Sequence, residues 1–221
     1  MKKNLTICFL MLTLIVYGQD TVKETNTHKG EFSFGVRSTG SLFSASGNYF
    51  GIGAGWQFRY RIADKMNTEG FGDWIVTDIG GLGQRFDAHI GGSWVNYPGK
   101  RTSQKNRFTP YILGGFCGDY TKIKTNLRFD DIALIYLKQS KDRWSFATQL
   151  GLGAHYNITE RFDISFSTQY VLHFGKDIDA KVQTNTLGVK YLQIQKEGNA
   201  LEGHLFLTIS ANCVIADLNK K

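Results

Sequence analysis

A strict two-residue alternation runs from Phe50 to Ile62. Apolar side chains take every second position, and glycine, glutamine or arginine takes the positions between them. Successive side chains of a β-strand point to opposite faces, so the pattern predicts a strand with one apolar and one polar face. The stretch also contains Gly51, Gly53 and Gly55, but a dinucleotide-binding loop needs G-x-G-x-x-G followed by a helix. Because the third glycine comes one position early and no helical pattern follows, we exclude that loop.

The same alternation recurs along the chain. Its clearest copies, 144–158 and 162–174, are separated by a short turn, which predicts an antiparallel hairpin. Weaker copies lie at 31–43, 85–97, 107–124, 185–195 and 203–215. Most copies reach the roughly 9 to 11 residues that a tilted strand needs to cross a membrane. We therefore predict an all-β fold, an antiparallel up-and-down transmembrane β-barrel of about eight strands.

The number of strands stays open. With the strands given above, the longest connections, 64–84 and 125–143, lie on the same side of the barrel as both termini. Outer-membrane barrels have short turns on that side. A further strand through "DWIVTDIGG", residues 73–81, would remove the conflict.

The first residues predict export. Lys2 and Lys3 precede a short apolar run from Leu5 to Val16, and the small residue Gly18 follows it. This is the pattern of a secretory signal peptide, and the run is shorter than the roughly 20 residues of a spanning helix. We divide the chain into a cleaved signal peptide (1–19), a flexible lead-in (20–30), the barrel (31–216) and a C-terminal tail (217–221).

The composition agrees with a membrane barrel. The mean hydropathy of −0.24 is ordinarily that of a water-soluble protein, but strands that alternate lipid-facing and interior side chains average to a near-neutral value. The chain is 14% aromatic and contains 25 Gly and 2 Pro, as suits a barrel with aromatic girdles. Basic residues exceed acidic ones, which fits contact with anionic lipopolysaccharide, although the surplus is scattered. Nucleic-acid binding is not expected, because Arg59 and Arg61 point to the opposite face from Tyr60.

The polar face predicts a filled interior. An eight-stranded barrel is narrow enough for side chains to fill it. Buried charges have to pair, because an isolated ion out of water is costly. We expect a paired polar network built from the inward residues Arg59, Arg61, Arg85, Asp87, His89, Gln149, His155, Asp163, Gln169 and His173.

Three segments carry a resemblance to a known family. They are the leader ending "YGQ", the stretch "FTPYILGGFCGDYTKI" (108–123) and the stretch "GLGAHYNITERFDISFSTQYVLHFGKD" (151–177). In these the chain resembles the small outer-membrane β-barrel proteins of Bacteroidetes-type bacteria, which are similar in style to the OmpA and OmpX barrels. The resemblance implies a bacterial outer-membrane location and a barrel architecture. It says almost nothing about activity.

One candidate catalytic set was considered. Small outer-membrane barrels of similar size include enzymes that modify the acyl chains of lipid A. Such chemistry needs a nucleophile, a base and an orienting carboxylate, and His155 or His173 with Ser165 or Ser167 and Asp163 provides these residue types. All of them face the packed interior rather than the lipid, so we expect no catalytic residues.

A metal site and a disulfide were considered in the same way. His89, His155 and His173 have no local ligand spacing, so we expect ordinary interior histidines, no metal and no cofactor. Cys117 falls on the inward face and Cys213 on the outward face, and a disulfide needs both side chains directed at each other. We therefore expect two free thiols in the mature chain.

These patterns favour a non-enzymatic outer-membrane barrel with a structural or adhesive role exercised through its loops. The expected partners are outer-membrane lipid and lipopolysaccharide, with a further protein partner unknown, and the chain is expected to be a monomer. Three alternatives stay open: a lipid A-modifying enzyme, a narrow pore, and a soluble lipocalin-like barrel with the apolar face inside.

Overall fold

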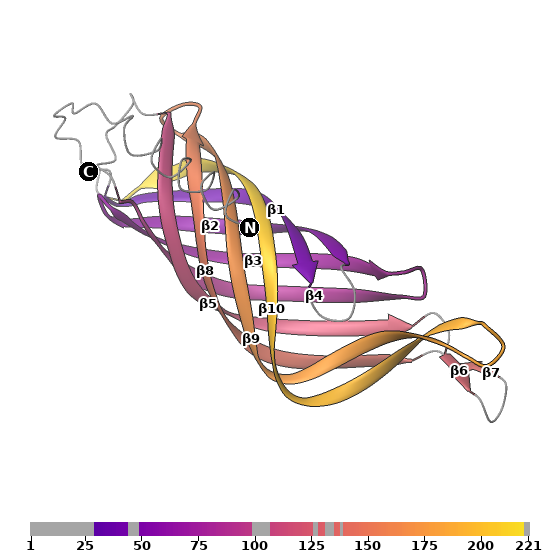
Figure 1. The fold of residues 1–221 in the computed structure, drawn as a ribbon. Helices are drawn as coiled ribbons and strands as arrows, with labels where there is room; N and C mark the ends of the chain where they lie inside the picture. Colours follow the sequence, from indigo (N-terminus) through magenta and orange to yellow (C-terminus); the bar gives the residue numbers. More distant parts are fainter. Residues whose placement is uncertain are drawn as a thin grey trace, which may run out of the picture.

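A closed antiparallel β-barrel of eight strands makes up the protein in the computed structural model (Figure 1). The structure describes residues 29–43, 49–98, 107–125, 128–130, 135–137 and 139–218. The barrel strands are β1 (Glu31–Phe43), β2 (Phe50–Ala63), β3 (Met66–Ile79), β4 (Gly83–Asn96), β5 (Phe108–Thr125), β8 (Ser140–Asn157), β9 (Phe162–Thr184) and β10 (Lys190–Asp217). A separate pair, β6 (Arg128–Asp130) with β7 (Ile135–Leu137), lies between β5 and β8 along the chain. The predicted fold class is confirmed. The predicted signal peptide and residues 20–28 lie outside the described residues.

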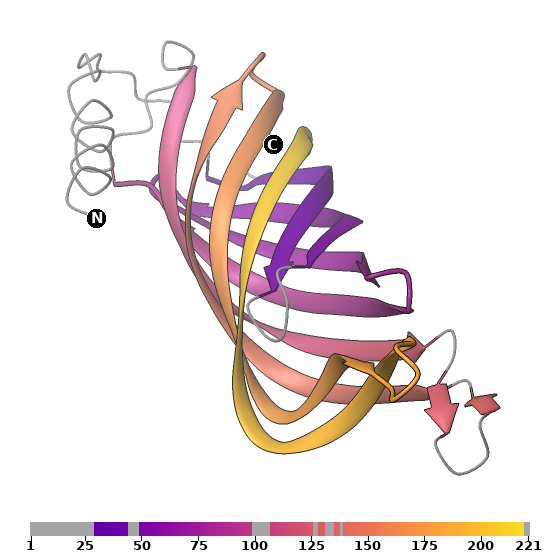
Figure 2. The same cartoon turned by 45° about the vertical axis from the view of Figure 1, so that its right-hand side comes forward.

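Each barrel strand pairs with its neighbour along the chain, and the first strand pairs with the last. β1 runs antiparallel to β10 from Glu31 opposite Asp217 to Phe43 opposite His204. This pairing leaves the barrel without a free edge. We call the end near Glu31 and Asp217 the terminal end, and the end near Phe43 and Gly83 the hairpin end. Figure 2 shows the strands wrapping around a common interior.

The two faces of the strands divide as their alternation predicts. Large apolar side chains point outward, as Ile52, Leu150 and Trp144 do with exposed fractions of 65%, 67% and 75%. Outward aromatic rings also meet across strands, for example Tyr120 and Trp144 at 4.9 Å between ring centroids. The inward side chains are mostly polar and buried. This arrangement is the reverse of a lipocalin, in which the apolar face lines the interior.

The sequence-based strand list missed β3. The structure places a strand at Met66–Ile79, which includes most of the stretch 73–81 where a further strand was considered. Its alternation is weak because Phe71 and Ile75 are buried inside, whereas the outward positions include Gly70 and Gly72. Aromatic rings of β2 lie over both glycines. The apolar cover of these positions is therefore supplied by the neighbouring strand.

The list also divided one strand into two. The predicted strands 185–195 and 203–215 belong to the single strand β10, Lys190–Asp217. A register shift between Lys196 and Asn199 marks a β-bulge against β9. A bulge inserts one extra residue and interrupts the alternation, which explains the division. The first residues of the predicted segment, 185–188, form the turn before β10, where Asn185 Oδ1 accepts hydrogen bonds from the amides of Leu187 and Val189.

Both corrections keep the number of barrel strands at eight and change the side on which the long connections lie. The connection from β5 to β8 and the extended β9–β10 ribbon are now at the hairpin end, away from the termini. β9 pairs with β8 only as far as Phe174, and β10 pairs with β1 only from His204 onward. Between these limits the two strands pair only with each other, and we call residues 175–203 the outer hairpin. Figures 1 and 2 show that this hairpin is bent. Gly175, with φ of 145°, and the β-bulge lie at its base.

Candidate functional site: the ionic interior of the barrel

Charged and polar side chains gather inside the barrel. All ten residues predicted for the interior are buried, with exposed fractions of 7% or less. Sequence reasoning left out further interior groups on the same faces: Arg37, Glu69, Asp73, Asp119, Arg143, Glu202 and His204. Asp119 and Arg37 lie on the inward positions of predicted strands, so the alternation alone would have found them. Glu69 and Asp73 belong to the missed strand β3.

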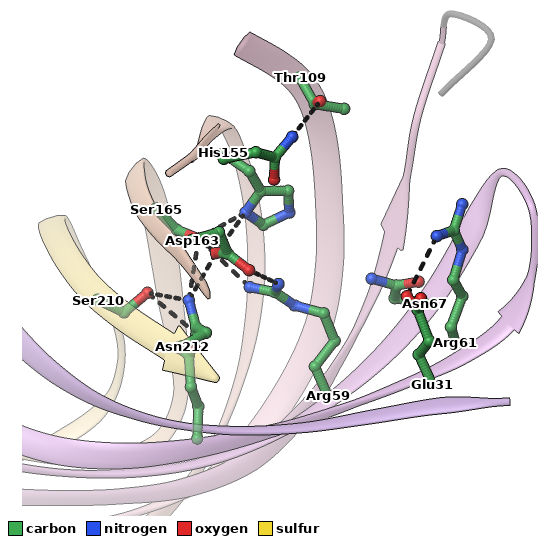
Figure 3. A network of polar contacts seen from close by, with 12 residues as sticks. Glu31, Arg59, Arg61, Asn67, Thr109, His155, Asp163, Ser165, Ser210 and Asn212 are labelled. Atoms are coloured by element: carbon green, nitrogen blue, oxygen red, sulfur yellow. Dashed lines mark hydrogen bonds and ion pairs between the residues drawn. The ribbon is translucent and has the colours of Figure 1, made fainter. Parts of the chain in front are cut away.

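An arginine organises the terminal end of the interior. Arg59 of β2 reaches Glu69 on the adjacent strand at 2.7 Å and Asp163 of β9 across the barrel at 3.2 Å. Figure 3 shows Arg59 and Asp163 pointing toward each other from different strands. Asn212 of β10 donates to Asp163 at 2.9 Å and extends the network to the closing strand. Paired charges with additional hydrogen bonds are the form in which ions are retained in a protein interior.

The structure brings the predicted Ser–His–Asp residues together in an order unsuited to catalysis. His155 Nδ1 contacts Ser165 Oγ, and Asp163 Oδ1 lies 3.5 Å from the same ring nitrogen. Ser165 in turn donates to Asp163 at 2.9 Å. A nucleophile relay needs the serine and the carboxylate on different ring nitrogens, but His155 Nε2 meets the hydroxyl of Tyr97 at 2.9 Å. The trio is a buried hydrogen-bonded cluster rather than an activated serine.

The centre of the barrel holds Arg37, Asp73 and a histidine pair around Asp119. Arg37 Nε lies 3.0 Å from Asp73 Oδ1, and its guanidinium carbon is 4.9 Å from the ring centroid of Phe71. His89 Nε2 and His173 Nδ1 each lie 3.0 Å from an oxygen of Asp119. The three histidines considered as metal ligands are not together. His173 is opposite Ala147 of β8, eight residues from His155, or about 26 Å at 3.3 Å per residue.

A third charged group lies toward the hairpin end. Arg85 Nε lies 2.9 Å from Asp87 Oδ2, and Arg85 Nη1 lies 2.8 Å from Glu202 Oε1. Arg143 also contacts Glu202, and His204 Nε2 lies 3.0 Å from the same carboxylate. Glu202 thereby links β10 to β4 and β8. Each charged group therefore joins at least two strands that are not neighbours in the barrel.

An apolar cluster closes the hairpin end above these charges. It consists of Ile79, Ile123, Ile178, Leu192 and Ile194, all with exposed fractions of 4% or less. Three of its members belong to the outer hairpin, and Lys141 of β8 donates to the backbone carbonyl of Ile194 at 3.2 Å. The bent hairpin therefore covers the interior at this end and seals it with aliphatic side chains. We call these five residues the apolar seal.

The two cysteines of the described residues lie where the alternation places them. Cys117 is buried inside and Cys213 is exposed outside, and both are free thiols. Among the described residues, no helix is long and apolar enough to span a membrane.

The fold and the faces define a class, a β-barrel with an apolar exterior and an interior filled by ion pairs. The family model for the outer membrane protein beta-barrel domain matches residues 7–192. The chain therefore belongs to the outer membrane protein β-barrel family, which places it with proteins of the bacterial outer membrane. Curated proteins give no match to the sequence.

Two solved structures share the architecture. Neisserial surface protein A is 11% identical with a TM-score of 0.57, and the match covers 83% of this chain and 97% of that one. A major outer membrane protein from Thermus thermophilus is 12% identical with a TM-score of 0.53, covering 82% of this chain and 98% of that one. At these identities the likeness concerns the fold alone.

Proposed function

We propose that the protein is a non-enzymatic outer-membrane barrel with a closed interior that binds a surface outside the cell through its outer hairpin. In this proposal the signal peptide is cleaved and the terminal end faces the periplasm. The observation that carries the proposal is the outer hairpin itself. β9 and β10 are 23 and 28 residues long, more than twice the roughly 9 to 11 residues that cross a membrane, so the surplus projects on one side.

The tip of the outer hairpin supports a binding role. Leu187 and Val189 in the turn have exposed fractions of 72% and 37%, and Lys190 beside them is also exposed. The Asn185 side chain hydrogen-bonds both apolar residues' amides, which holds the turn in one shape. An ordered apolar tip on a projecting ribbon is suited to contact with an external apolar surface.

The filled interior supports a closed barrel rather than a narrow pore. Ion pairs fill the barrel at three levels, and the apolar seal covers them at the hairpin end. We propose that the outer wall contacts membrane lipid and lipopolysaccharide as a monomer. The arrangement of Ser165, His155 and Asp163 supports the non-enzymatic assignment over lipid A chemistry.

The test compares cells that carry the protein with cells that carry the double variant Leu187→Ser/Val189→Ser. Adhesion of the cells to polystyrene, an apolar surface, is expected to fall several-fold in the variant. The control is Ile158→Ser, since Ile158 is 50% exposed in a turn at the terminal end, which the proposal places in the periplasm. Equal adhesion of all three strains would contradict the proposal. Stable open-channel currents from the purified protein in a planar bilayer would favour the pore instead.

A further inference from the structure

Asp119 differs from the other buried carboxylates of the described strands. Each of the others, Glu69, Asp73, Asp87, Asp163 and Glu202, lies within ion-pair distance of an arginine. Asp119 is completely buried, and the structure shows it paired only with imidazoles. A buried carboxylate requires a positive charge beside it. Here no described arginine or lysine forms an ion pair with the carboxylate, and a cation bound between it and the imidazoles would supply that charge.

The strand register brings the two histidines to this carboxylate. His89 of β4 is the direct register partner of Asp119 on β5. His173 lies two strands farther on, and β8 between them presents only the small inward side chains Ser145 and Ala147. Because these side chains are small, the ring of His173 can extend across β8 and reach Asp119.

The contacts around Asp119 are close but are not all hydrogen bonds. His89 Nε2 and His173 Nδ1 lie 3.0 Å from the carboxylate oxygens, yet neither nitrogen has the direction of a hydrogen bond to any described group. Asp119 Oδ1 accepts no hydrogen bond either. Its other oxygen, Oδ2, accepts a hydrogen bond from Ser145 at 3.1 Å. Thr121 Oγ1 lies 3.3 Å from Oδ2 but donates to Asp87 at 2.7 Å. The ring nitrogens of both histidines and Oδ1 of Asp119 are thus left with unused bonding capacity inside the barrel, which calls for an unseen group.

We propose that His89, Asp119 and His173 bind one divalent transition-metal ion, of which zinc is the type, inside the barrel. Their ligand atoms all lie within 4.8 Å of one another, and two imidazole nitrogens with one carboxylate oxygen are a ligand set that zinc accepts. Oδ1 faces His89 Nε2 and Oδ2 faces His173 Nδ1, and Ser145 donates to Oδ2, the way in which outer hydrogen bonds orient metal ligands. The ion would pin β4, β5 and β9 together at the centre of the barrel.

The first test uses the whole mature chain, unfolded in urea with chelator and refolded into detergent micelles with Co²⁺. Cobalt replaces zinc in such sites and reports nitrogen and oxygen coordination through its visible absorption. One saturable equivalent per chain is expected. His173→Gln and Asp119→Asn should each weaken the affinity at least about tenfold. The matched control is His155→Gln, a buried histidine in a different cluster, which should bind as the wild type does.

Folding of each variant is checked by the mobility shift between unheated and boiled samples on a gel. A second measurement needs no variant. The urea midpoint of the wild-type protein should rise with Zn²⁺ concentration, because an ion that binds only the folded state stabilises it. The proposal is overturned if His173→Gln binds Co²⁺ like the wild type, or if Zn²⁺ leaves the midpoint unchanged.

Discussion

At the scale of single residues, glycine allows strands to approach where side chains from the next strand need space. Gly55, from the run with which the chain first shows its alternation, lies inside the barrel. A Cβ atom at this position would overlap the backbone carbonyl of Gly72 and the carboxylate of Asp73. The glycine at this position therefore allows β2 to pack closely on β3. It also leaves space for the carboxylate of Asp73, which forms the central ion pair with Arg37.

Gly55→Ala should lower the free energy of unfolding by about 1–3 kcal/mol, the usual range for overpacking. The overlap falls on backbone, which cannot turn away as a side chain would. Urea unfolding in detergent micelles measures the effect. Gly114→Ala is the control, since a Cβ there would meet nothing closer than 3.9 Å. Equal midpoints for the two variants would show that β2 and β3 can separate at no cost.

At the scale of elements, the alternation predicted strands well where each face has one character. β2, β5, β8 and the barrel part of β9 were found because lipid and the interior select opposite side chains along their length. β3 was missed because its inward face carries Phe71 and Ile75 and its outward face carries glycines covered by rings of β2. The prediction divided β10 into two strands because a β-bulge interrupts its alternation. A bulge depends on how β10 pairs with β9, which the sequence of one strand does not show. The ion-pair partner of each interior charge could not be predicted for the same reason, because it depends on the register between strands.

The outer hairpin should detach when its apolar contact is broken. Leu192→Asp places an unpaired carboxylate in the apolar seal, at a position with no exposed surface. The cost of burying that charge exceeds roughly 1.4 kcal/mol, so protease cleavage within residues 175–203 should accelerate at least about tenfold. The barrel itself should keep its compact mobility on unheated gels.

Leu187→Asp is the matched control for the hairpin, because Leu187 is 72% exposed at the tip and outside the seal. Its cleavage rate should stay close to that of the wild type. If both variants are cut equally fast, the hairpin is open without any substitution, and the seal does not hold it.

At the scale of the whole molecule, the barrel has an apolar outer face and a polar inner face. Cys213 lies on the outer face and Cys117 on the inner face, so their labelling tests both assignments. An apolar maleimide added to the folded mature protein in liposomes should label Cys213, which is exposed outside, and leave Cys117, which is 1% exposed, untouched. One equivalent is therefore expected in the folded protein and two after unfolding. Mass spectrometry counts the labels, and Cys213→Ser should abolish labelling of the folded form. Labelling of Cys117 in the folded form would reverse the assignment of the two faces.

The pairing of the first strand with the last has a consequence for assembly. Glu31 lies opposite Asp217, so the hydrogen bonds of β1 on one side have no partner until β10 is in place. Hydrocarbon offers no substitute partner for those groups. A barrel without β10 would thus present an open edge to the bilayer. Joining β1 to β10 therefore removes the last barrel edge that hydrocarbon would leave without hydrogen bonds.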